Sequence, residues 1–221
     1  MSKAETAKRY ILCIAGLFFA AVGVAFSKHG ELGVSPISSV SNVLYCRFDD
    51  ISLGMWLVIW NCVMIVGQVL ILRRDFKLME LLQVPLSFLF GWFTDLGMIF
   101  VSLIPVDTYP VRLLMIIIGT VILSFGISLS VIANVIMNSG EAFVRALSDK
   151  MHKEFGYVKI GFDIFCVLLA VTLSMIFFDL TIVGVREGTV IAAVFTGIIV
   201  KFFGSILKKP LDRFLTGNRP E

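Results

Sequence analysis

Apolar residues dominate six long stretches of the chain, and these stretches set the first expectation about the fold. They cover residues 9–27, 53–72, 79–104, 111–137, 158–182 and 188–207. Each is close to the length of roughly 20 apolar residues that a helix needs to cross a bilayer. Only helices and closed barrels satisfy their backbone hydrogen bonds in lipid, so we predict an all-α polytopic membrane protein with six transmembrane helices. The length of the first stretch favours an uncleaved span over a signal peptide.

Two shorter, more polar stretches interrupt this pattern, and each predicts a short helix. In the first, Ser35 is expected at the N-cap and Pro36 at the first helical position, with the helix covering 36–46. In the second, Asn138 is the expected cap of a helix over 139–152, and Glu141 stands where a capping box places its acid. Both helices are too short to span, so we predict half-helices inside the membrane. Amphipathic helices lying in the interface are the alternative.

The half-helices occupy matching places in the two halves of the chain, about 103 positions apart. Aligning Gly23 with Gly126 places Ser35 on Asn138, and each half then contains a span, a half-helix and two further spans. The repeats are residues 1–105 and 106–221. Because each half contains three spans, an odd number, the second half enters the membrane upside down. The pattern therefore predicts two inverted three-helix repeats, unless the likeness between the halves arises by chance.

Composition and charge agree with a membrane location. Hydrophobic residues make up 58% of the 221 positions and charged residues only 16%, with a net charge of +3. Most Lys and Arg residues fall near the N-terminus, at 73–77, at 145–159 and from 201 onward. These segments share one side of the membrane in a six-span topology. The positive-inside rule therefore predicts that both termini are cytoplasmic.

Polar residues in or beside the spans are the candidates for a functional site, because such groups are costly in lipid. The substrate-binding candidates are Ser35, Ser38, Asn61, Asn138, Glu141 and Asp163. The candidates for proton or ion coupling are Glu141, Asp163 and Asp95. Each carboxylate also has a structural alternative: Glu141 closes a capping box, Asp163 reaches the interface, and Asp95 pairs with another side chain.

The sequence contains no pattern typical of an enzyme, a cofactor site or nucleic-acid binding. Cys13, Cys46, Cys62 and Cys166 show neither metal-ligand spacing nor a disulfide framework. Nucleophile elbows, P-loops and dinucleotide fingerprints are also missing from the sequence. We therefore expect no catalytic activity, cofactor or metal.

Three short motifs resemble the YczE/YitT-like family of small bacterial integral membrane proteins. They are Gly33-Val34-Ser35-Pro36, Asp95-Leu96-Gly97, and Gly188-Thr189-Val190 after Val183-Gly184. The resemblance implies a protein of the bacterial inner membrane, with transport as the usual assignment and a vitamin-like substrate hinted at by associated regulators. This chain departs from the family at 138–141, where Asn-Ser-Gly-Glu lacks the proline that often precedes the acidic residue.

Two functions are compatible with these observations. The first is a secondary transporter of a small polar or zwitterionic metabolite, with alternating access around a midplane site at the two half-helix N-termini. The second is a substrate-binding module that works with energising partner subunits. Gly16, Ala21 and Ala25 would then offer a small-residue docking face. A homodimer is compatible with either function, and the sparse polar residues argue against a channel.

Overall fold

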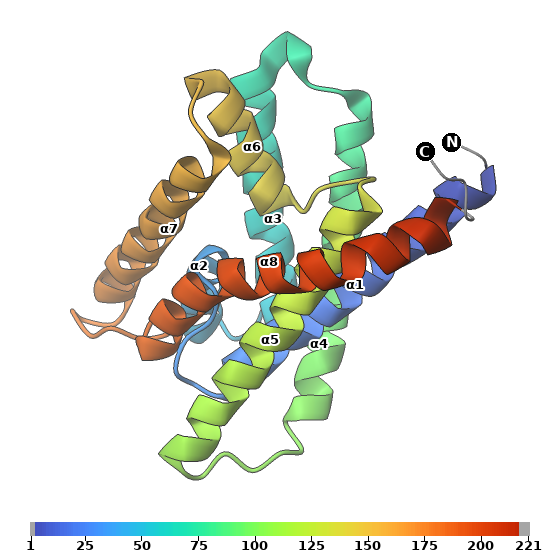
Figure 1. The fold of residues 1–221 in the computed structure, drawn as a ribbon. Coiled ribbons are helices and arrows are strands. Elements are labelled where there is room, and N and C mark those ends of the chain that lie inside the picture. The colour runs from blue at the N-terminus through green and yellow to red at the C-terminus, as the bar shows by residue number, and fades with distance from the viewer. Residues whose placement is uncertain (1–2, 217–221) are drawn as a thin grey trace.

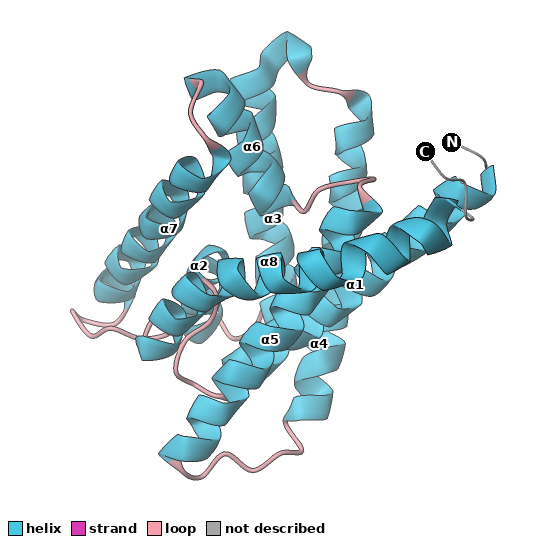
Figure 2. Cartoon of the chain, in the orientation of Figure 1, coloured by secondary structure: helices cyan, strands magenta, loops and turns pink. Residues whose placement is uncertain are grey.

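The computed structural model describes residues 3–216, which form eight α-helices, two 3₁₀ turns and no strand (Figures 1 and 2). Six helices are long and apolar enough to cross a membrane, as the sequence predicts, so the chain is a multi-pass membrane protein. They are α1 (Lys3–His29), α3 (Leu53–Leu72), α4 (Gln83–Val101), α5 (Tyr109–Ala133), α7 (Phe155–Phe177) and α8 (Glu187–Thr216). The predicted half-helices are α2 (Pro36–Arg47) and α6 (Ser139–Met151), and the turns are η1 (Arg73–Asp75) and η2 (Leu78–Leu82).

Helices α5, α7 and α8 end at positions other than the ends of their apolar stretches, because the backbone conformation ends the first two earlier and lets the third continue. Asn134 adopts a left-handed conformation with φ of 48° and caps α5, which therefore ends four residues before the apolar run does. Helix α7 ends at Phe177, followed by Asp179 and Leu180 with positive φ. Helix α8 continues past residue 207 and includes Pro210. Hydropathy thus located the spans but not their ends.

Helices α1 and α5 form the centre of the molecule and run antiparallel, with glycines at their closest approach. A Cβ atom added at Gly16 would lie 2.7 Å from the carbonyl oxygen of Gly126, and one at Gly23 would lie 2.6 Å from that of Gly119. Such contact between backbones is typical of membrane helices that meet through small residues.

The small-residue face of α1 is therefore covered within this chain. Gly16 packs on α5, Ala21 and Ala25 are fully buried, and Ala25 contacts Gly97 of α4. The expectation that this face receives a partner subunit was wrong, because its small residues already serve the contacts of α1 with α4 and α5.

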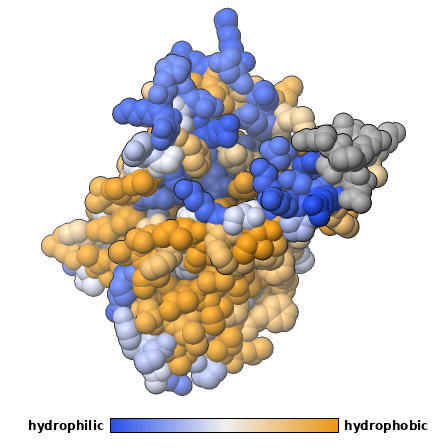
Figure 3. Space-filling view, in the orientation of Figure 1, coloured by the Kyte–Doolittle hydropathy of each residue, from blue (hydrophilic) through white to orange (hydrophobic). Residues whose placement is uncertain are grey.

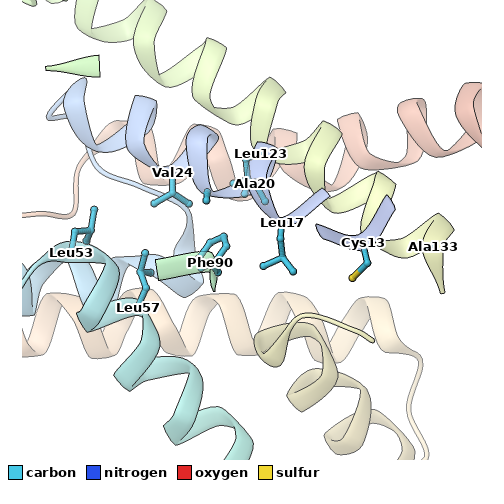
Figure 4. Close-up of a cluster of buried hydrophobic side chains, with 10 residues drawn as sticks. Cys13, Leu17, Ala20, Val24, Leu53, Leu57, Phe90, Leu123 and Ala133 are labelled. Carbon is cyan, nitrogen blue, oxygen red and sulfur yellow. The ribbon is translucent and has the colours of Figure 1, made fainter. Parts of the chain in front are cut away.

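The other helices surround this pair in two similar sets. Helix α4 packs on α1, and α8 packs on α5. Each short helix packs against a span of the other half, α2 on α7 and α6 on α3. The largest apolar cluster combines residues of α1, α3, α4 and α5 (Figure 4). Its labelled members are Cys13, Leu17, Ala20, Val24, Leu53, Leu57, Phe90, Leu123 and Ala133.

The second and third spans pack against each other in the first half of the chain but not in the second half. Helices α3 and α4 pack closely, and a Cβ added at Gly91 would lie 2.6 Å from the carbonyl oxygen of Gly54. Helices α7 and α8 do not pack and diverge from their connection (Figure 1). Among the described residues, nothing from another element lies within 4 Å of a Cβ added at Gly156 or Gly197.

The surface separates a hydrophilic end from a largely hydrophobic face. In Figure 3 hydrophilic residues gather at the top, where Figure 1 places the ends of α3 and α6, and hydrophobic residues cover much of the face below. Lys8 Nζ donates to the carbonyl oxygen of Phe214 at 2.9 Å, so the beginning of α1 and the end of α8 lie together. The exposed apolar side chains, such as Ile11, Val190 and Phe202, contact the lipid bilayer.

Candidate functional site

The first turns of the two short helices meet inside the molecule. A Cβ added at Gly140 of α6 would lie 3.0 Å from Cδ1 of Ile37 in α2. Each helix begins where its sequence predicts. Ser35 is the N-cap of α2 and Pro36 its first residue, and Asn138 is the N-cap of α6. The N–H groups of a first helical turn have no partner within the helix and carry partial positive charge. Two such ends therefore point toward one region.

The serines at the start of α2 bond to each other rather than to the backbone. Ser35 occupies the N-cap position with φ of −56° and ψ of 151°, but its side chain makes no capping hydrogen bond. Its hydroxyl donates instead to the Ser38 hydroxyl at 3.0 Å, and Ser38 is buried. Neither Ser35 nor Ser38 therefore accepts a hydrogen bond from the backbone N–H groups in the first turn of α2.

The capping box predicted at the start of α6 does not form. Oδ1 of Asn138 accepts from the backbone N–H of the next residue, Ser139, at 2.9 Å. A capping box needs a bond from the cap side chain to the N–H of the third helical residue, Glu141, and the Asn138 side chain does not make it, so the prediction was wrong in this detail. The carboxyl of Glu141 also makes no hydrogen bond to the backbone N–H of Asn138 among the described residues.

Glu141 lies instead in an electrostatic cluster with Lys159 and Asp163 of α7. Lys159 Nζ forms an ion pair with Asp163, 2.5 Å from its Oδ1. Helix α6 is not one of the six spanning helices. Burial raises the pKa of the Glu141 carboxyl, the Lys159 ammonium lowers this pKa, and the Asp163 carboxylate raises it. Two candidate carboxylates therefore share the field of one ammonium group, and Asp163 is paired with it.

Asn61 and its neighbour Trp60 bring unpaired polar groups close to the same region. Asn61 of α3 is 6% exposed, and no hydrogen bond of its side chain is found among the described residues. The indole N–H of Trp60 is buried without a partner in residues 3–216. Trp60, Ile37 of α2 and Phe143 of α6 all pack against the same buried apolar cluster, which consists of Met64, Val144, Val158, Phe162 and Cys166. The hydrogen-bonding groups of both side chains are therefore unused among the described residues.

Asp95 is placed away from the other carboxylates and caps a helix. Its Oδ2 accepts from the hydroxyl of Ser52 at 2.6 Å, and its Oδ1 accepts from the N–H of Gly54 at 2.8 Å. Both partners lie at the start of α3, whereas α6 packs farther along this helix, near Gly67. The structure therefore does not bring Asp95 together with Glu141 and Asp163.

The structure also shows a buried polar network that we did not predict from the sequence. Gln68 and Gln83 exchange side-chain hydrogen bonds of 3.1 Å, and Gln68 also donates to the carbonyl oxygen of Ser139 at 3.0 Å. The hydroxyls of Ser87 and Ser139 lie 3.2 Å apart. Two glutamines at the ends of apolar spans were the available signal, but their pairing depends on the docking of α6. An adjacent cavity of about 20 Å³ has room for about one water.

No group of three or more His, Cys, Asp or Glu residues is arranged to hold a metal within the described part of the chain. The four cysteines are free thiols. The contacts described above are hydrogen bonds, an ion pair and helix ends, which suit noncovalent binding of a polar ligand.

The fold and these contacts define an all-α multi-pass membrane protein in which two short helices meet inside six apolar helices. The chain belongs to the family of unknown function DUF6198, which matches residues 7–205. No curated protein and no solved structure matches the chain.

Proposed function

We propose that this protein is a secondary transporter of a small polar or zwitterionic metabolite. The observation that carries the proposal is the meeting of the first turns of α2 and α6, at Ile37 and Gly140, within a multi-pass membrane protein. Convergent helix N-termini attract anions, and discontinuous helices of secondary transporters bind substrate in this way. The anionic part of the substrate is expected at these helix ends, beside Ser35, Ser38 and Asn138.

The cationic part of the substrate, or a coupled proton, is expected near Glu141 and Asp163. The two carboxylates interact with each other and with Lys159. Protonation of one of them changes the charge of the cluster, which is the property that a coupling site needs. We retain Asn61 as a substrate-binding residue because it is 6% exposed and its side chain makes no hydrogen bond among the described residues. Asp95 is a weaker coupling candidate because it caps α3.

Reciprocal contacts between the halves support the inverted-repeat interpretation. With an offset of about 103 positions, the contact of Gly16 with Gly126 corresponds to that of Gly23 with Gly119. Likewise, α2 on α7 corresponds to α6 on α3. Ile37 and Gly140, at equivalent positions, contact each other, as expected beside an axis that relates the repeats.

The unequal packing of α3 with α4 and of α7 with α8 supports alternating access. In an inverted-repeat transporter the two halves exchange conformations, so one state has one half closed and the other half open. The backbone contact of Gly54 with Gly91 lies in the closed half. Gly156 and Gly197, their counterparts by helix position, lie in the open half.

We place the protein in the bacterial inner membrane with both termini cytoplasmic. The positive-inside rule supports this orientation, and so does the contact of Lys8 with Phe214, which joins the two end helices. The short motifs that resemble the YczE/YitT-like family support the bacterial location and a vitamin-like substrate as one possibility within the proposed substrate class.

The direct test is uptake into liposomes that contain only the purified chain. Radiolabelled vitamins, amino acids and other small zwitterions are supplied with and without a pH gradient, and uptake is measured. We expect saturable uptake of at least one compound, which Asn138→Ala weakens, and loss of its pH dependence in Glu141→Gln. Asp149→Asn, an exposed carboxylate change on the same helix, is the matched control and retains both. Uptake that keeps its pH dependence when Glu141, Asp163 and Asp95 are all neutralised would refute the coupling assignment.

The alternative function is a substrate-binding module that requires energising partner subunits. One observation favours it: α8 exposes Val194, Ile198 and Phe202, together with glycines that no other element contacts among residues 3–216. A partner helix could pack there as well as lipid. Binding of a substrate by the pure chain, with transport only after co-reconstitution with co-purified subunits, would support this function. Transport by the pure chain would exclude it.

A further inference from the structure

A second polar cavity lies away from the meeting point of the short helices. It has a volume of about 200 Å³, equivalent to roughly six or seven water molecules at about 30 Å³ each. Three segments far apart in the sequence line it: the end of α1 with the connection that follows, the later turns of α2, and the connection between α7 and α8. The lining residues are Lys28, Glu31, Gly33, Asn42, Cys46, Val183 and Gly184.

Asn42 lines this cavity and has an unused hydrogen-bond acceptor. Its side chain is 2% exposed, and its Nδ2 donates to the carbonyl oxygen of Gly184 at 2.7 Å. This bond fixes the orientation of the carboxamide. Its Oδ1 is buried and has no partner among the described residues. A buried acceptor without a partner destabilises the folded protein, and a ligand with an N–H or O–H group would recover this cost.

Lys28 provides a positive charge that no carboxylate of the described chain neutralises. Its Nζ contacts the Cys46 sulfur at 3.3 Å and lies 5.1 Å from the centre of the Tyr45 ring. A thiol and an aromatic face are weak partners for an ammonium group. The nearby carboxylate of Glu31 forms an ion pair with Arg112 instead. An anionic group in the cavity would give Lys28 the stronger, charge-assisted partner that it lacks.

We propose that this cavity binds a small molecule, or a lipid headgroup, in which an anionic group lies next to a hydrogen-bond donor. The anionic group pairs with Lys28, and the donor bonds Oδ1 of Asn42. Glycine has this chemistry as a free solute, and phosphatidylethanolamine has it in a headgroup. The inference rests on the cavity alone and is independent of transport, because the site lies on the later part of α2 rather than at its first turn.

The test uses Cys46, which lines the cavity, as a reporter of occupancy. Detergent-purified protein is labelled with N-ethylmaleimide, and peptide mass spectrometry follows each of the four cysteines. Glycine is compared with trimethylglycine, which keeps the carboxylate but has no N–H group, and with methylammonium, which has no anionic group. We expect glycine to slow the labelling of Cys46 by about tenfold when its concentration is about ten times its Kd, and the other two probes to protect far less.

Two variants and a control assign the protection to the named groups. Lys28→Met and Asn42→Ala are each expected to reduce the protection by glycine, measured as the ratio of rates with and without glycine in the same variant. Lys150→Met, at an exposed lysine of α6, retains the protection. The shift of apparent Tm with the same probes provides a second readout if Cys46 does not react.

Nanodiscs distinguish the two sources of the ligand. Slower labelling of Cys46 in phosphatidylethanolamine than in phosphatidylcholine, whose headgroup has no N–H donor, would identify a lipid ligand. Protection by glycine in detergent would identify a free solute. If Cys46 labelling and apparent Tm are unchanged by glycine, and the two lipids give equal rates, the proposal is wrong.

Discussion

Single residues in this protein acquire their roles from partners on other elements. Asp95 is an isolated acidic residue in an apolar stretch. From the sequence, a role in proton or ion coupling and a structural pairing with another side chain were equally favoured. In the structure its two oxygens accept hydrogen bonds from Ser52 and Gly54 at the start of α3. A carboxylate that stabilises a helix start has a structural role that the sequence did not identify, because the two segments meet only after folding.

Replacement of this helix cap should lower stability without removing coupling. We expect Asp95→Ala to reduce the free energy of unfolding by about 1–2 kcal/mol, since capping and charge-assisted hydrogen bonds contribute about this much. The measurement is reversible unfolding in mixed detergent micelles, with Asp107→Ala at an exposed position as the control. An unchanged stability together with a lost pH dependence of transport would show that Asp95 couples instead.

The paired glutamines at the start of α6 give a second prediction at this scale. Gln68→Leu removes the partner of Gln83 and of the Ser139 carbonyl, and should cost about 1–2 kcal/mol. Each single variant leaves the other glutamine without its partner, whereas the double variant Gln68→Leu/Gln83→Leu removes both amides. Its loss of stability should therefore be smaller than the sum of the two single losses. Unfolding of the two single variants and the double variant measures this coupling. Strict additivity would contradict a direct bond between the two side chains.

At the scale of elements, glycines have different roles in different helices. Gly126 of α5 is in contact with α1, and an added Cβ would lie 2.9 Å from Cα of Ala20. Gly161 of α7 has no atom of another element within 4 Å of an added Cβ in the described structure. Sequence hydropathy treats both as small residues in an apolar span. Only packing separates a required glycine from a replaceable one.

This difference predicts opposite effects of the same substitution. Gly126→Ala should destabilise the protein by about 1–3 kcal/mol, because the backbones of α1 and α5 must separate. Gly161→Ala, the matched control, should be neutral or stabilise by up to about 1 kcal/mol, since alanine is the better helix former. Apparent Tm in detergent and unfolding measurements give the comparison. Equal effects in the two variants would mean that α1 and α5 do not touch at Gly126.

At the scale of the whole molecule, the two halves share their main helix contacts except at one pair of spans. Under the proposed alternating access, α7 and α8 close in the second state as α3 and α4 do here. This closure would bring Gly156 toward Gly197, the counterparts of Gly54 and Gly91. The open pair of spans is then a property of one state rather than of the fold.

Cross-linking tests this exchange. With Cys13, Cys46, Cys62 and Cys166 replaced by alanine, Gly156→Cys and Gly197→Cys are combined and oxidised in liposomes. We expect a disulfide whose yield changes when substrate is added, because substrate shifts the populations of the two states. The control pairs Gly156→Cys with Gly204→Cys, about two helical turns away on α8, and should not cross-link. Failure of the first pair under all conditions would contradict closure of α7 on α8.

The sequence by itself determined the six spans, the two short helices and where the latter begin. These features depend on local quantities: the length of an apolar run sets whether a helix can cross the bilayer, and Ser35-Pro36 and Asn138 mark helix starts. The sequence also made Glu141 and Asp163 candidates for a functional site, because charges in lipid are costly wherever they occur.

Only the tertiary structure decided what these residues meet. It placed Ile37 against Gly140, paired Asp163 with Lys159, assigned Asp95 to the start of α3, and joined Gln68 to Gln83. It also left α7 apart from α8. The physical reason is that helix formation in lipid follows from each segment's own backbone and side chains, whereas a contact depends on which faces of distant helices pack together.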